Sequence, residues 1–138
     1  MSDLFGQEHV RRYRASDGVV GHKWREGSSV LLLTTTGRKS GRESTTPLIY
    51  DRTGDDVVVV ASKGGAPRDP GWYRNLRLHP EVGVQIKGDR FRARARTARG
   101  EERDRLWQQM NRVWPHYAEY QEKTQRRIPV VVLERLSR

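Results

Sequence analysis

The strongest constraint on the fold is a run of alternating apolar and polar residues from position 82 to position 96, interrupted by one turn. Val82, Val84 and Ile86 alternate with polar or small residues, and the alternation resumes after Gly88-Asp89. A period of two on both sides of a Gly-Asp pair is typical of a β-hairpin with one buried face. Arginines occupy positions 90, 92, 94 and 96, so we expect them on the solvent-exposed face of the second strand.

The rest of the sequence predicts short helices and short strands. Val57–Ala61 is apolar at every position and rich in β-branched residues, which favours a strand covered on both faces. Asp69-Pro70 is a typical helix start, with Asp69 as the cap. The other expected elements are helices over residues 4–16, 70–78, 106–114 and 115–124, strands over residues 30–36, 44–51 and 129–133, a turn over 51–54 and a loop over 62–67.

Six strands with short connections predict an α+β, mainly β fold. We expect a six-stranded antiparallel β-barrel with flanking helices. A length of 138 residues suffices for one core, so the chain is expected to form a single domain over residues 1–138. Residues 1–25 would form an N-terminal helix and lead-in, and residues 30–135 the barrel core.

Charge and composition limit the classes of ligand and of chemistry that the protein can have. The formal net charge of +10 attracts anions, which leaves nucleic acid, an acidic membrane surface or an anionic cofactor as partners. The absence of cysteine excludes thiolate chemistry, and the spacing of the four histidines argues against a metal site. The chain contains neither a G-x-S-x-G motif nor a Walker A loop. We expect no transmembrane span or secretory signal, hence a cytoplasmic protein, with association with the inner face of the membrane as an alternative.

Two loops are suited to an anionic ligand. Gly37–Arg42 combines three cations, two glycines and a serine at a strand exit, although a solvated hairpin loop has the same composition. Ser62–Gly65 directly follows a buried strand, where it is either a ligand loop or a flexible surface turn. Trp107 and Trp114 share a helical stripe with Leu106 and are better explained as core than as stacking platforms.

Several sequence blocks together resemble the deazaflavin-dependent nitroreductase family. They occur in the family's order between about Val30 and Leu133, a span that makes up most of the chain. The blocks are Leu32-Leu33-Thr34-Thr35-Thr36-Gly37-Arg38-Lys39-Ser40-Gly41, Thr46-Pro47-Leu48, Val60-Ala61-Ser62-Lys63-Gly64-Gly65, Pro70-Gly71-Trp72-Tyr73-Arg74-Asn75-Leu76 and Ile128-Pro129-Val130-Val131. The resemblance implies a split β-barrel and the cofactor coenzyme F420, an 8-hydroxy-5-deazaflavin with a phosphodiester and a polyglutamate tail.

The resemblance also implies which residues bind the cofactor. The basic loop would hold the anionic tail, the strand after it would line the passage, and two further segments would contact the deazaflavin ring. These residues are Arg38, Lys39, Ser40, Ser44, Thr45, Thr46, Pro47, Val60, Ala61, Ser62, Lys63, Gly71, Trp72, Tyr73, Arg74 and Asn75. Ser44 stands where the nitroreductase that names the family has an arginine.

The implied reaction is hydride transfer to an electron-poor acceptor such as a quinone, nitro compound or activated enone. Trp114, Tyr117 and Tyr120 would bind this acceptor, and Ser62, Tyr117 and Tyr120 are the candidate catalytic residues. We expect a small-molecule acceptor, no nucleic acid and a monomer or weak homo-oligomer, with peripheral membrane contact left open. The alternatives are an FMN-dependent oxidoreductase on the same barrel and a basic nucleic-acid-binding barrel that uses the arginine-rich strand.

Overall fold

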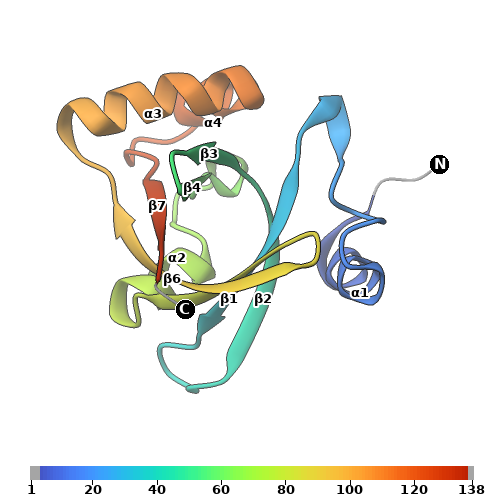
Figure 1. The fold of residues 1–138 in the computed structure, drawn as a ribbon. Coiled ribbons are helices and arrows are strands. Elements are labelled where there is room, and N and C mark those ends of the chain that lie inside the picture. The colour runs from blue at the N-terminus through green and yellow to red at the C-terminus, as the bar shows by residue number, and fades with distance from the viewer. Residues whose placement is uncertain (1–3, 137–138) are drawn as a thin grey trace.

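A curled antiparallel sheet forms the centre of the molecule, with helices packed around it (Figure 1). The computed structural model describes residues 4–136. The strands are β1 (Val30–Thr36), β2 (Glu43–Ile49), β3 (Asp51–Thr53), β4 (Asp56–Val60), β5 (Glu81–Ile86), β6 (Asp89–Thr97) and β7 (Val130–Arg135). The helices are α1 (Gly6–Ser16), α2 (Gly71–Leu78), α3 (Gly100–Val113) and α4 (His116–Glu122), with 3-10 turns η1 (Arg25–Gly27) and η2 (Lys63–Gly65).

The strand order makes the sheet barrel-like. The order is β2-β1-β5-β6-β7-β4-β3, so the two edge strands are β2 and β3. These edges are consecutive in the chain, separated by Tyr50 alone. The sheet must therefore curl until its edges meet at that residue. The expected α+β, mainly β architecture is confirmed in this broad form.

The predicted number of six strands is wrong, because the described residues contain seven. Residues 51–53, predicted as a turn, form β3 and pair with β4 in the register Asp51 to Val58. All three side chains are polar, so no alternation of apolar and polar residues in the sequence reveals this strand, which is defined by backbone hydrogen bonding.

The hairpin prediction is confirmed in β5 and β6. Val84 pairs with Phe91 and Val82 with Ala93, and all four side chains are buried in the barrel interior. The arginines at positions 90, 92 and 94 are exposed on the outer face. Arg96 is half-buried there and forms ion pairs with Glu102 and Glu134 at 2.6 and 3.1 Å.

Strand β4 is covered on both faces, as its unbroken apolar sequence predicts. Val57 and Val59 belong to the barrel interior, whereas Val58 and Val60 pack with Leu106 and other residues beneath α3. β7 alternates in the same way. α3 and α4 thus lie together against the outer face of this part of the sheet, and α1 covers β1 on another side of the molecule (Figure 1).

The start of α2 differs from the prediction. Pro70 is the cap residue and Asp69 makes no cap hydrogen bond; Asp69 instead forms an ion pair with Arg126 at 2.9 Å.

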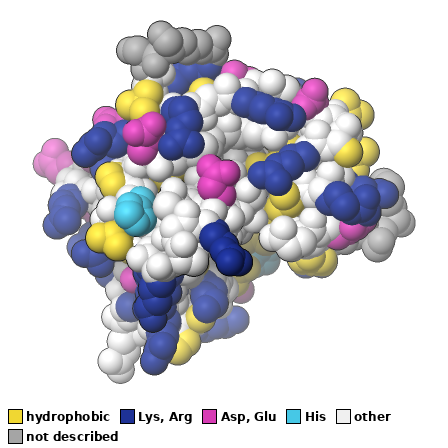
Figure 2. All heavy atoms as spheres, turned by 90° about the horizontal axis from the view of Figure 1, so that it is seen from below, with side chains coloured by type: hydrophobic (Ala, Val, Ile, Leu, Met, Phe, Trp, Pro, Cys, Tyr) yellow, Lys and Arg dark blue, Asp and Glu magenta, His cyan; other side chains and the backbone are white. Residues whose placement is uncertain are grey.

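None of the described helices is both long and apolar enough to span a bilayer. Lys and Arg side chains are spread over the face shown in Figure 2, as the net charge of +10 leads us to expect.

Candidate functional site

A pocket of about 400 Å³ lies where the curled sheet stays open, between β2 and the carboxyl end of β4. Its walls come from these two strands, from the loop after β4, from the start of α2 and from α4. The lining residues are Trp24, Thr46, Pro47, Leu48, Ile49, Val60, Ser62, Lys63, Gly64, Pro70, Gly71, Trp72, Trp114, Tyr117 and Tyr120. Segments distant in sequence therefore converge on one concave, mostly apolar site.

Aromatic side chains form one wall of this pocket. The ring centroids of Trp24 and Trp114 lie 5.7 Å apart, and those of Tyr117 and Tyr120 lie 6.2 Å apart. The indole Nε1 of Trp114 donates a hydrogen bond to the Tyr120 hydroxyl oxygen at 3.3 Å. Because that oxygen accepts from Trp114, the Tyr120 O–H is left to donate to another acceptor. The wall offers flat apolar surface together with hydroxyl donors.

Tyr117 is the most deeply buried of these pocket residues on α4, with 4% of its surface exposed. Burial raises the pKa of the Tyr117 phenol above its usual range. The hydroxyl therefore keeps its proton near neutral pH and acts as a hydrogen-bond donor. A protonated donor next to an apolar surface suits an acceptor whose oxygen gains negative charge during reduction.

The loop after β4 forms the side of the pocket that adjoins this aromatic wall. Among the described lining residues, Lys63 carries the charge, and its backbone has a φ of 46°, in the left-handed region that residues other than glycine rarely adopt. Gly65 has a φ of 84° and lies so close to α4 that a Cβ there would stand 2.5 Å from the carbonyl oxygen of Tyr120. The loop and α4 are thus packed in direct contact.

The basic loop 37–42 is hydrogen-bonded to α2. The Asn75 Oδ1 accepts hydrogen bonds from the backbone N–H and the guanidinium of Arg38, at 3.2 and 2.8 Å. The Asn75 Nδ2 donates to Thr35 Oγ1 of β1 at 3.1 Å. Since Gly71 and Trp72 of the same helix line the pocket, the basic loop lies beside the end of the pocket that α2 closes.

Ten of the predicted site residues line the pocket: Thr46, Pro47, Val60, Ser62, Lys63, Gly71, Trp72, Trp114, Tyr117 and Tyr120. Arg38 and Asn75 lie beside it through the contacts described above. Lys39, Ser40, Ser44 and Arg74 are exposed. Exposed cations at the rim of an apolar pocket can reach a long anionic ligand.

Three predicted residues point elsewhere. Thr45 Oγ1 is hydrogen-bonded to Thr34 Oγ1 and accepts from Arg14 of α1, both at 2.7 Å. Ala61 is fully buried in the barrel interior. Tyr73 is also buried there, and its hydroxyl is hydrogen-bonded to Thr97 at 2.8 Å.

Sequence reasoning did not single out five of the lining residues: Trp24, Leu48, Ile49, Gly64 and Pro70. It also missed Arg126, which lies outside the pocket and contacts one of its loops. Trp24 lines the pocket, packs between Phe5 and Trp114, and donates from Nε1 to the Leu4 carbonyl at 3.0 Å. Arg126 contacts the loop after β4 from behind. Trp24 is a single tryptophan in an irregular segment, and Arg126 is one of many arginines, so neither carried a local signal.

His116 forms a charged link at the rim of the pocket. Its ring nitrogens donate to Glu26 of η1 at 2.8 Å and to Glu119 at 2.7 Å. The ring also lies 4.7 Å from that of Trp114 and stacks near Tyr120. Both hydrogen bonds raise the pKa of His116, and the bond to Glu26 has the larger effect. His116, in its protonated form, ties α4 to the segment that carries Trp24.

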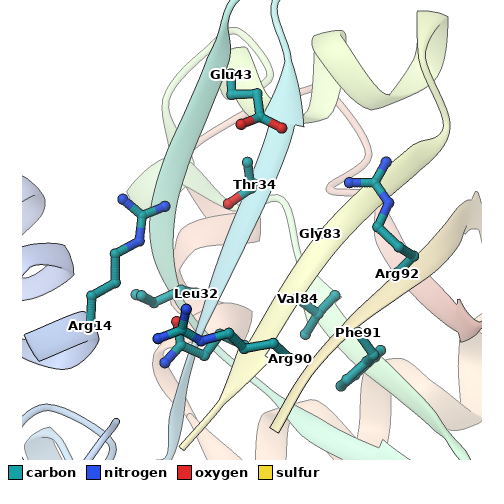
Figure 3. Close-up of a pocket in the computed structure, with 10 residues that line it drawn as sticks. Arg14, Leu32, Thr34, Glu43, Gly83, Val84, Arg90, Phe91 and Arg92 are labelled. Carbon is teal, nitrogen blue, oxygen red and sulfur yellow. The ribbon is translucent and has the colours of Figure 1, made fainter. Parts of the chain in front are cut away.

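A second hollow of about 360 Å³ lies on the outer face of β1, β5 and β6 (Figure 3). Arg14, Arg90 and Arg92 surround it, together with Thr34 and Glu43. Each arginine already has a partner: Arg14 bonds Thr45, Arg90 pairs with Asp17 and Arg92 with Glu81. Phe91 is the aromatic residue among those that line this hollow, whereas the pocket at the open side of the barrel has five aromatic residues in its lining and is the better candidate site.

The described residues contain no cluster of three or more His, Asp or Glu side chains that could hold a metal ion. The chemistry of the pocket itself is that of aromatic walls, hydroxyl donors and one lysine, with arginines and a lysine at its rim. Such a set fits a flat ring that carries an anionic extension.

Comparison with known proteins agrees with this geometry. A family model described as F420H(2)-dependent quinone reductase matches residues 5–135. An F420H(2)-dependent quinone reductase of Mycobacterium tuberculosis is 44% identical over 130 residues, which cover 92% of this chain and 87% of the relative.

Two solved structures are also similar. One is described as the F420-H2 dependent reductase FDR-A; it is 42% identical with a TM-score of 0.71, covering 76% of this chain and 93% of that chain. The other is described as a domain-swapped dimer; it is 39% identical with a TM-score of 0.74, covering 93% of this chain and 96% of that chain.

Proposed function

Because the chain belongs to the F420H(2)-dependent quinone reductase family, we propose that the pocket at the open side of its barrel is where coenzyme and quinone meet. The protein is an oxidoreductase that uses coenzyme F420 and acts on quinones. The observation that carries the placement is the convergence of Lys63, Trp114, Tyr117 and Tyr120 on one pocket from segments far apart in sequence.

The residues present fit the coenzyme in two parts. The deazaflavin ring would lie against Ser62, Lys63 and Trp72, where the pocket is concave and largely apolar. The phosphodiester and glutamates would extend to Arg38, Lys39 and Ser40 of the basic loop. Cations at this position offset the charge of the tail, and the hydroxyl of Ser40 adds a donor. Ser44, Thr46, Pro47, Val60, Gly71, Arg74 and Asn75 complete the proposed binding site.

The protein's own contribution to the reaction is to orient the quinone and supply a proton. When bound, the reduced coenzyme supplies a hydride, so the reduction is a two-electron step. Trp114 and Trp24 would hold the flat face of the quinone. Tyr117 and Tyr120 would donate hydrogen bonds to its oxygen, and one of them would transfer a proton to the oxygen that gains charge. Ser62 would orient the ring from the other side.

We also propose a barrel type, domain bounds, an oligomeric state and a cellular location for this protein. The curled sheet is assigned to the split-barrel type, with one domain over residues 1–138 and its barrel core over residues 30–135. The protein is proposed to act in the cytoplasm as a monomer or weak homo-oligomer. In this form it would also be able to contact the inner face of the membrane. Sedimentation at several concentrations tests the oligomeric state, since a stable dimer would contradict it.

Parallel titrations with oxidised coenzyme F420, FMN and a short DNA duplex test the proposed function. We expect a dissociation constant of about one micromolar or tighter for coenzyme F420, read from ring fluorescence. FMN should bind clearly less well, because it lacks the polyglutamate tail. Tighter binding of FMN would contradict the cofactor assignment, and salt-sensitive DNA binding without coenzyme binding would favour a nucleic-acid-binding protein.

A further inference from the structure

Arg126, between α4 and β7, concentrates its hydrogen bonds on a single segment. Its Nε donates to the Ala66 carbonyl at 2.8 Å, and one terminal nitrogen donates to the Ser62 carbonyl at 2.7 Å. The other terminal nitrogen contacts the Ala61 carbonyl at 3.2 Å and the Asp69 carboxylate at 2.9 Å. One guanidinium therefore fixes four acceptors within residues 61–69, a geometry that a planar five-donor group allows.

This segment is the loop that lines the pocket with Ser62, Lys63 and Gly64. Lys63 adopts the left-handed conformation at φ 46°, which costs free energy for a residue with a Cβ and persists only where the surroundings enforce it. Arg126 binds the carbonyl just before Lys63 and the carbonyl of Ala66, three residues after it. The contacts thus bracket the strained residue.

Arg126 is not itself placed to bind a ligand. Its side chain is 14% exposed, it does not line the pocket, and its charge is paired with Asp69. Backbone carbonyls and a carboxylate occupy four of its five N–H donors, so the paired fork that binds a phosphate is not available. Its effect on the site must pass through the backbone of the loop.

We propose that Arg126 is a positioning residue, which holds Lys63 in its left-handed conformation and so presents Ser62 and Lys63 to the coenzyme. This inference rests on the proposed function of the pocket and assigns a role to a residue that lies outside it. It predicts that the contribution of Arg126 to coenzyme affinity depends on how readily residue 63 adopts a positive φ.

Substitutions at two positions test this dependence. Lys63→Ala and Lys63→Gly both remove the amine, but glycine adopts a positive φ readily and alanine does not. With Arg126 present, the two variants should bind oxidised coenzyme F420 within about threefold of each other, because Arg126 enforces the conformation. With Arg126→Gln added, the alanine variant should bind about tenfold more weakly than the glycine variant. Arg126→Lys should behave like Arg126→Gln, since one ammonium cannot reach all four acceptors.

A second readout needs no coenzyme. The N–H groups of Gly65 and Ala66 donate to the carbonyls of Ser62 and Lys63, at 2.9 and 3.1 Å. Their hydrogen exchange in the ligand-free protein should be faster in Arg126→Gln and unchanged in Arg127→Gln. Arg127 is a matched control, because it is the neighbouring arginine with a side chain 69% exposed.

The outcomes separate the two proposals. Unchanged exchange and affinity in Arg126→Gln, or equal losses in the alanine and glycine backgrounds, would overturn the positioning role. If the unsubstituted protein fails to bind the coenzyme, the proposed function falls, while the exchange measurement still decides whether Arg126 holds the loop. Should Arg126→Gln fail to fold, Arg126→Lys provides the same comparison with the charge kept.

Discussion

Lys39 provides the sharpest test of the basic loop at the scale of one residue. Its side chain is exposed, whereas Arg38 also holds Asn75, so Arg38→Ala would disturb α2 as well. We expect Lys39→Ala to weaken coenzyme binding by about 1 to 3 kcal/mol, the usual cost of a lost charge-assisted contact. Arg94→Ala, an equally exposed cation on the outer face of β6, should leave affinity unchanged. Equal losses in fluorescence titrations of both variants would mean general electrostatic attraction and would contradict a specific tail site.

The tyrosines of α4 lead to a prediction about turnover. Tyr117→Phe or Tyr120→Phe removes a hydroxyl donor but keeps the aromatic wall, so kcat for quinone reduction should fall about tenfold or more. Coenzyme affinity should stay within about twofold, because the lost interaction is made to the reacting quinone. Tyr50→Phe, whose hydroxyl is bonded to His22 outside the pocket, is the control. Unchanged kcat in both variants would leave proton delivery to solvent.

At the scale of elements, the close approach of the loop after β4 to α4 can be tested with two glycines. Gly64 and Gly65 both have a positive φ, but a Cβ at Gly64 would meet open space and one at Gly65 would clash with the Tyr120 backbone. Each alanine variant carries a conformational cost of about 1 kcal/mol. Gly65→Ala must also displace α4, so urea unfolding should show a clearly larger loss of stability than for Gly64→Ala. Equal losses would show that the contact is not tight in solution.

The link between α4 and η1 through His116 gives a pH dependence. Its pKa is raised in the folded state, so its contribution to stability is complete below about pH 6.5, the ordinary value, and is lost as pH rises through the folded-state pKa. The difference in unfolding free energy between the natural protein and His116→Gln should therefore shrink as the pH increases. Glu26→Gln should lower the pKa of His116 in an NMR titration. A pH-independent difference would contradict the charged link.

The elements also show what sequence can and cannot reveal. The β5–β6 hairpin and the two-faced burial of β4 were predictable, because side-chain alternation or its absence directly records which faces are covered. β3 was not, since its pairing rests on backbone hydrogen bonds of polar residues. Most of the pocket followed from motifs of the resembled family. Trp24, Arg126 and the bond from Arg14 to Thr45 were out of reach, because they depend on contacts between residues far apart in the chain.

At the scale of the whole molecule, the net charge of +10 should act on the coenzyme's tail and not on its ring. Raising the salt concentration from about 0.05 to about 0.5 M shortens the screening length several-fold, so coenzyme F420 should bind more weakly. A deazaflavin without the phosphodiester and glutamates should show little change, since its ring meets an apolar pocket. Isothermal titration of both ligands measures this difference. Equal salt dependence would place the electrostatic attraction at the ring.

β7 joins two parts of the sheet that are far apart in the chain. β3–β4 and β5–β6 are local hairpins, but β4 and β6 are neighbours only through β7, which pairs Val60 with Val130 and Ala95 with Leu133. Such non-local pairing is slow to form, so we expect the hairpins to assemble first and the barrel to close last. Arg126 lies four residues before β7, so the same late step brings it to the pocket loop. Affinity for the coenzyme should therefore appear only when folding is complete, and the coenzyme should act as a ligand that selects and stabilises fully folded chains.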